Sequence, residues 1–308
     1  MDKDLSLEAG CREMIPFRSC STLLQACCLT VMLIATHPAQ AHWSFDTELG
    51  MKYDNNLGNA RAGDSVSDHA LIALVAATQS SYRDDGSSFS WGGRIAAEDY
   101  ARYAGLDNLA LGASIGYRKK LGLGPLAPWW RASWSSSALS YREHARNGRL
   151  HQADVGVGKR FSERSNLGIT LRIEQRTAAN RDELVPGLSG DAFSQLSKCI
   201  LMNTEYAPAR DMVLSLGGEL RRGDIVSTSH RYRQVFLFSK AIAEDKALGT
   251  DVYAYRLTGN TLNLNVALAW FLSPDSHVNI ALQRIITHGD GNNNYTKNRA
   301  ALSWVGNF

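Results

Sequence analysis

The stretch that decides the fold is WSFDTELGMKY, residues 43–53. Its odd-numbered residues are mostly large and apolar, whereas its even-numbered residues include Asp46, Glu48 and Lys52. An alternation with a period of two is typical of a β-strand with one apolar and one polar face. The run covers about eleven residues, which exceeds the ~5–6 of an average strand and matches the ~9–11 that a membrane-crossing strand needs.

The same alternation recurs in five further segments, 89–98, 109–118, 167–174, 212–221 and 262–270. The segment 223–260 is ambiguous, because residues 235–238 (VFLF) and 252–255 (VYAY) each fit a short additional strand, which would raise the total to fourteen. Without them we predict twelve strands, at 43–54, 69–83, 88–98, 108–120, 129–142, 150–161, 166–176, 194–206, 212–222, 261–271, 277–287 and 297–308.

The connections between these strands alternate between short turns, such as 84–86 and 273–276, and longer polar loops, such as 55–67 and 177–192. Many aromatic residues lie at the strand ends that meet the short turns. Membrane barrels have short periplasmic turns, longer outside loops and aromatic girdles at the membrane interfaces. The sequence therefore predicts an all-β fold, a transmembrane antiparallel up-and-down β-barrel with twelve or fourteen strands.

The N-terminal residues predict export. Residues 19–36 carry no charge, Arg18 precedes them, and the small-residue sequence Ala-Gln-Ala follows at 39–41. This order of a positive end, an apolar centre and a cleavage site is typical of a secretory signal peptide. The residues before Met14 carry a net negative charge, whereas a signal peptide begins with positive charge. We therefore expect translation to start at Met14. The predicted domains are a signal peptide at 1–41, cleaved before His42, and a barrel at 42–308.

Composition excludes several classes of protein. The chain has 308 residues and a formal charge of +3, with no basic run, which argues against nucleic-acid binding. Of the five cysteines only Cys199 lies beyond the predicted signal peptide, so the sequence predicts neither a disulfide nor a cysteine-based metal cluster in the barrel.

The last ten residues, RAALSWVGNF (299–308), place Leu302, Trp304 and Phe308 on one strand face. Together with the export signal and the repeated strands, this ending resembles the terminal strand of bacterial outer-membrane β-barrel proteins, including porin-like ones. The resemblance implies a location in the bacterial outer membrane and contact with its lipid. It also implies that Trp304 and Phe308 form the signal that the barrel-assembly machinery binds.

The sequence gives little support for catalysis or for a cofactor. Outer-membrane phospholipases place a His and a Ser two residues apart on one strand, but His151 is followed at that distance by Ala153. Without a nucleophile beside its base, the covalent route fails. The histidines have no metal-ligand spacing, and residues 288–294 fit a turn better than a calcium loop. We predict no catalytic residue, metal or cofactor, and an outer-membrane hydrolase remains a minor alternative.

We predict a polar, charged inner face on every strand of the barrel, with charges of both signs. A mixed wall suits a narrow polar pore or a closed, ion-paired interior. We therefore predict a channel or porin-like conduit for small hydrophilic solutes. The alternative is a plugged structural or partner-binding barrel, such as an accessory to export or surface assembly, in which 223–260 folds inward or binds ligands outside. The candidate lumen-lining residues are Glu48, Lys52, Arg94, Glu98, Arg118, Arg172, Glu174, Glu219 and Arg221.

Overall fold

A computed structural model describes residues 42–308. The predicted signal peptide at 1–41 lies outside the described residues. None of the helices in residues 42–308 is long and apolar enough to cross a membrane. The barrel strands are β1 (His42–Asp54), β2 (Asp68–Tyr82), β3 (Ser87–Tyr100), β4 (Asn108–Lys120), β5 (Trp129–Tyr141), β6 (Gly148–Ser162), β7 (Ser165–Ala178), β8 (Gln195–Ala209), β9 (Met212–His230), β11 (Val252–Ser273), β12 (Ser276–Gly289) and β13 (Asn293–Asn307).

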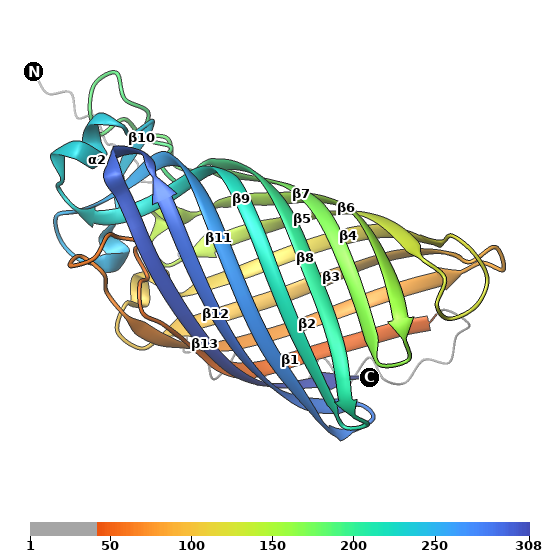
Figure 1. Ribbon diagram of the computed structural model, residues 1–308. Helices are drawn as coiled ribbons and strands as arrows, with labels where there is room; N and C mark the ends of the chain where they lie inside the picture. The colour runs from red at the N-terminus through yellow and green to blue at the C-terminus, as the bar shows by residue number, and fades with distance from the viewer. Residues whose placement is uncertain (1–41) are drawn as a thin grey trace, which may run out of the picture. The chain divides into compact units, whose positions relative to one another are not determined.

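These twelve strands form one closed antiparallel sheet, which confirms the predicted barrel and its strand count (Figure 1). Sequential strands are neighbours, except that β9 pairs with β11, and β13 returns to pair with β1. The closing seam continues to the last residue, because Phe45 and Phe308 exchange two backbone hydrogen bonds of 2.8 Å. Within the ring of twelve strands, each strand is therefore paired on both sides, as a barrel in lipid requires.

The segment 223–260 differs from both predicted versions. Residues 252–255 are not a separate strand but the start of β11, because the pairing of β11 with β9 runs without a register shift from Val252 to Trp270. Residues 235–238, whose four apolar side chains do not alternate, belong to the short helix α2 (Arg233–Leu237) and its end. The additional strand is instead β10 (Ala241–Glu244), which pairs with β11 outside the closed barrel.

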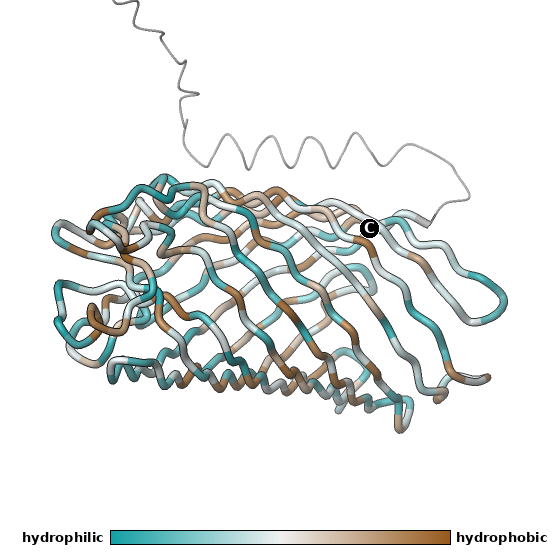
Figure 2. Tube along the Cα trace, turned by 90° about the horizontal axis from the view of Figure 1, so that it is seen from above, coloured by the Kyte–Doolittle hydropathy of each residue, from teal (hydrophilic) through white to brown (hydrophobic). Residues whose placement is uncertain are grey.

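Apolar side chains cover the outer face of the barrel. Hydrophobic and hydrophilic residues alternate along the strands (Figure 2). The end with the short turns carries outward aromatic rings, and Trp43 contacts Trp91 edge to face with ring centroids 5.2 Å apart. Exposed aromatic residues at this turn end are Trp43, Phe89, Trp91, Phe161, Tyr206, Trp270 and Phe308.

The buried apolar residues gather at the opposite, loop end rather than in the middle of the barrel. We name residues 223–260 the cap; they comprise the extended β9–β11 hairpin, α2, β10 and the 3-10 turn η3 (Lys246–Leu248). The cap lies at the end of the barrel away from the C-terminus (Figure 1). Its three hydrophobic clusters centre on Phe193, Tyr255 and Leu248. The loop end is thus the part of the protein that folds like a soluble core.

Candidate functional site

The strand register separates the inner face from the outer face. Residues directly opposite each other in an antiparallel ladder share a face. Arg172, Cys199, Arg221 and Thr261 face one another in turn across β7, β8, β9 and β11. The Arg172 and Arg221 side chains are each 25% exposed, whereas Leu171, on the other face, is 58% exposed. The polar row therefore lines the interior.

Most of the candidate lumen residues are brought together in ion pairs. Lys52 Nζ lies 2.5 Å from Glu98 Oε1, although β2 separates their strands. The Arg172 guanidinium donates two hydrogen bonds, of 2.8 and 2.9 Å, to Asp154. Such charge-assisted bidentate pairs are the stronger class of hydrogen bond and fix the side-chain direction.

Arg221 forms the centre of a second group on the inner wall. Its guanidinium lies 2.9 Å from Glu219 on the same strand and 2.9 Å from Glu174, two strands away on β7. Gln152 also donates to Glu174, at 2.7 Å. Side chains reach across an intervening strand most easily on the concave side of a sheet, so these contacts place the group in the lumen.

The remaining candidates lie apart from these pairs. Arg94 donates to Ser137 Oγ at 3.5 Å, a marginal hydrogen bond. Glu48 faces Leu74 on β2 and has no ion-pair partner among residues 42–308. The Arg118 guanidinium lies 4.6 Å from the centre of the Trp129 ring near the turn end, a cation–π distance.

The inner wall is not polar on every strand. Ile72, Leu74 and Ala76 of β2 face the inward residues Gly50, Glu48 and Asp46 of β1, so their side chains point into the barrel. The expectation of a polar inner face on each strand is therefore wrong for β2. The lumen has an apolar strip between charged neighbours.

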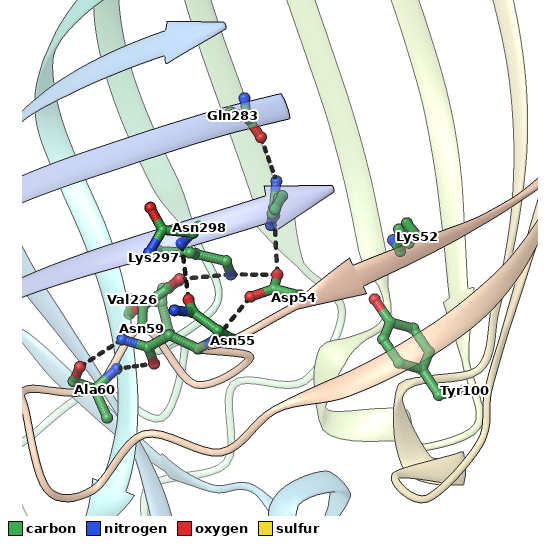
Figure 3. A network of polar contacts seen from close by, with 12 residues as sticks. Lys52, Asp54, Asn55, Asn59, Ala60, Tyr100, Val226, Gln283, Lys297 and Asn298 are labelled. Atoms are coloured by element: carbon green, nitrogen blue, oxygen red, sulfur yellow. Dashed lines mark hydrogen bonds and ion pairs between the residues drawn. The ribbon is translucent and has the colours of Figure 1, made fainter. Parts of the chain in front are cut away.

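A buried network at the loop end was not among the candidates (Figure 3). Asp54 Oδ2 lies 2.8 Å from both Lys297 Nζ and Arg299 Nε. Lys297 also donates to Asn59 Oδ1 at 3.0 Å, and Asn59 donates to the Val226 carbonyl of the cap at 3.1 Å. One signal was present in the sequence, because Asp54 continues the even-numbered charged positions of the first strand.

The cap is tied to the β5–β6 connection of the rim by a buried ion pair. Arg146, in the 3-10 turn η2 (His144–Arg146), donates to both carboxylate oxygens of Asp245 at 3.0 and 2.5 Å. Thr228 donates to the same carboxylate at 3.0 Å. Burial alone would lower the pKa of Arg146, but the Asp245 carboxylate outweighs it and raises that pKa. Arg146 therefore keeps its charge at neutral pH.

The cap contacts each of the five other loop-end connections. Leu57 and Leu106, from the first and second loops, belong to its cluster around Leu248. Phe193 from the β7–β8 loop packs in another cluster, and Gly291 from the β12–β13 turn lies against α2. Arg146 supplies the contact from the remaining loop. Because these loops surround the rim, the cap spans the mouth.

A cavity of about 340 Å³ lies beneath the cap. Its wall combines lumen groups and cap backbone, and the buried Asn263 Oδ1 has no hydrogen-bond partner among residues 42–308. The cavity is large enough for several water molecules. Polar residues that line it include Gln195, Glu219, Arg221, Asn263, Gln283 and Arg299.

The closed twelve-stranded sheet, its apolar outer face and its charged interior define the class: the protein is an outer-membrane β-barrel. No protein-family model matches the chain, and no curated protein matches its sequence. No family narrower than this class is therefore assigned.

One solved structure shares the fold, and two others show a weaker likeness. An outer-membrane channel from Pseudomonas putida F1 superposes with a TM-score of 0.57 at 10% identity, over 89% of this chain and 97% of that chain. The outer-membrane channel DcaP of Acinetobacter baumannii gives a TM-score of 0.42 at 6% identity, over 87% and 97%. The translocator domain of the autotransporter NalP from Neisseria meningitidis gives 0.41 at 11%, over 94% and 98%. At such identities the likeness concerns the fold alone.

Proposed function

We propose that the protein is a channel for small hydrophilic solutes whose loop-end mouth is gated by the cap. The observation that carries this proposal is the charged interior, in which the groups around Lys52, Arg172 and Arg221 line the wall beneath the cap. Their ion pairs offer polar partners of both signs to a passing solute.

The cap supplies the gate. The cap is held to the rim by polar contacts, at Asp245 and Asn59, and by apolar contacts with the surrounding loops, whereas the β10–β11 pairing lies within the cap itself. Local openings involve the least stable contacts of a fold. We infer that the cap swings or loosens as a unit, with the β9–β11 hairpin as its stem.

Liposome swelling tests the proposal. Proteoliposomes are compared for the wild type and for a variant in which residues 231–251 are replaced by Asn-Gly. His230 and Val252 face each other in the ladder, so a two-residue turn can join them. We expect faster swelling in small sugars and amino acids for the variant. If neither protein passes any solute while both are folded, the channel proposal is wrong.

A second candidate function is partner binding at the outer surface of the cap. A pocket of about 540 Å³ is lined by Tyr232, Tyr253, Phe236 and Arg231. The next residue of α2, Leu237, is 65% exposed. Exposed aromatic and arginine side chains are typical of binding surfaces. Loss of phage or protein binding to cells in the cap-replaced variant, without any change in swelling, would favour this function.

We also propose that the protein is not an enzyme. Purified protein is expected to release no fatty acid from phospholipid or from lipopolysaccharide. Release that disappears in a His144→Ala or His151→Ala variant would contradict this expectation.

A further inference from the structure

Two cations face each other on the outer surface of the barrel near the loop end. Lys198 of β8 lies directly opposite Arg222 of β9 in the register. Asn260 of β11 and His288 of β12 continue the same row, and all four residues are exposed. Cys199, the residue after Lys198, belongs to the inner row and is buried, so the exposed row points away from the lumen.

This pair is electrostatically incomplete. Like charges directly opposite each other in an antiparallel ladder are destabilising. Within residues 42–308 neither Lys198 nor Arg222 forms an ion pair. Asp224, on the same face as Arg222, is already engaged, because it lies 2.7 Å from Lys240 Nζ and accepts from the Leu196 amide at 3.0 Å. The two cations therefore fit an external anion.

An aliphatic row lies two residues closer to the turn end on the same face. Leu171, Ile200, Leu220, Leu262 and Ile286 face one another in turn across β7 to β12. The two rows together line an open groove of about 930 Å³. The order from loop end to turn end is cationic and then aliphatic, which is the order of a lipid's headgroup and chains.

We propose that this groove binds a lipid of the outer leaflet whose headgroup carries phosphate. The phosphate lies between Lys198 and Arg222 and accepts hydrogen bonds from both, which removes their mutual repulsion. The acyl chains lie along the aliphatic row, around Ile200 and Leu220. Basic clusters at the edge of a membrane-spanning surface recognise anionic headgroups in this way. The inference is independent of whether the barrel conducts.

Native mass spectrometry of the detergent-solubilised barrel tests the proposal. The probes are bisphosphorylated lipid A, the same lipid without its phosphates, and inorganic phosphate. We expect one tightly bound copy of the phosphorylated lipid. Affinity is expected to fall about tenfold or more in the variant Lys198→Gln/Arg222→Gln, the factor expected when a charge-assisted contact is lost. Lys159→Gln is the matched control, because Lys159 is an outward cation near the turn end.

Thermal stability provides a second measurement, in which the effect of Lys198→Gln on the melting temperature changes sign when lipid is added. Without lipid, Lys198→Gln is expected to raise the melting temperature because it removes a like-charge pair. With the phosphorylated lipid present, the same substitution is expected to lower it. The proposal would be overturned if the double variant bound the lipid as tightly as the wild type, or if Lys159→Gln lost as much affinity as the double variant. It would also be overturned if the phosphate-free lipid bound as tightly as the phosphorylated one. Competition by millimolar inorganic phosphate would show an adventitious anion only.

Discussion

The Asp245 carboxylate accepts two hydrogen bonds from the guanidinium of Arg146, which lies 99 residues away in sequence, in the β5–β6 connection. Asp245 is fully buried, and Arg146 is 13% exposed. Breaking one half of a buried ion pair is strongly destabilising, because the partner stays charged without compensation. The pair therefore controls how firmly the cap closes the mouth.

The first prediction concerns this pair. Asp245→Asn is expected to reduce the stability of the cap by about 3–5 kcal/mol while the barrel keeps its fold. Hydrogen exchange measured by mass spectrometry should become faster in β10 and unchanged in β4. Glu244→Gln is the matched control, since Glu244 is exposed and lies 3.6 Å from Lys246; its effect should stay below about 1 kcal/mol. If hydrogen exchange in β10 is equally fast in both variants, Asp245 does not hold the cap closed.

The second prediction concerns acid. Asp191, in the β7–β8 loop, lies 3.1 Å from Arg256 of the cap stem. Burial raises the pKa of Asp191, but hydrogen bonds from Ser189 and the Arg256 charge outweigh it and lower that pKa. A carboxylate whose pKa is lowered in the folded protein stabilises the fold at any pH above its unfolded pKa of about 4. This contribution is lost as the pH falls below that value. The cap should therefore loosen in acid.

Solute flux measured between pH 7 and pH 3 checks this prediction. The wild type should show rising flux at the acid end. Asp191→Asn should show raised flux already at neutral pH and a smaller change with pH. A wild-type flux that falls steadily in acid, with Asp191→Asn behaving identically, contradicts it.

The third prediction concerns ion selectivity. Glu98 accepts from Tyr100 and Asn108 as well as pairing with Lys52. Glu98→Gln leaves the Lys52 charge uncompensated in the lumen, so the zero-current potential in a salt gradient should move towards anion selectivity. Glu163→Gln, in the exposed β6–β7 turn, removes the same charge outside the lumen and should leave the potential unchanged. A shift of equal size in both variants would show only a net-charge effect.

The fourth prediction concerns assembly. Phe308 is 63% exposed on the outer face at the closing seam, and Trp304 lies on the same face. We expect Phe308→Ala to reduce the amount of folded barrel in the outer membrane, measured as heat-modifiable migration on a denaturing gel. Phe161→Ala removes an equally exposed turn-end aromatic from another strand and should assemble normally. Normal assembly of Phe308→Ala would refute the role of the terminal aromatic residue.

The barrel was predictable because lipid imposes one simple rule on every strand. Apolar residues must occupy alternate positions, as in residues 43–53, and this rule yields the strand positions and the count. It also places Arg172, Glu174 and Arg221 on the inner face before their contacts are known. In these strands the period-two alternation in the sequence matches the alternation of side chains between lipid and lumen.

The cap was not predictable by the same rule, because it lies beyond the lipid and packs like a soluble domain. Val235 is buried inside a helical turn closed by the Phe236 amide and the Tyr232 carbonyl, and no alternation signals it. The pairing of Arg146 with Asp245 depends on how the loops meet in space. Sequence spacing therefore carries no information about it, and the same is true of Lys297 with Asp54.

Single-channel current recording tests the gated-channel account most directly. Purified wild type, Asp245→Asn and Glu244→Gln are compared in planar bilayers at neutral pH. The account predicts discrete steps, with longer or larger openings for Asp245→Asn and unchanged openings for Glu244→Gln. Folded barrels that stay silent in all three cases, or that conduct identically in all three, would contradict it.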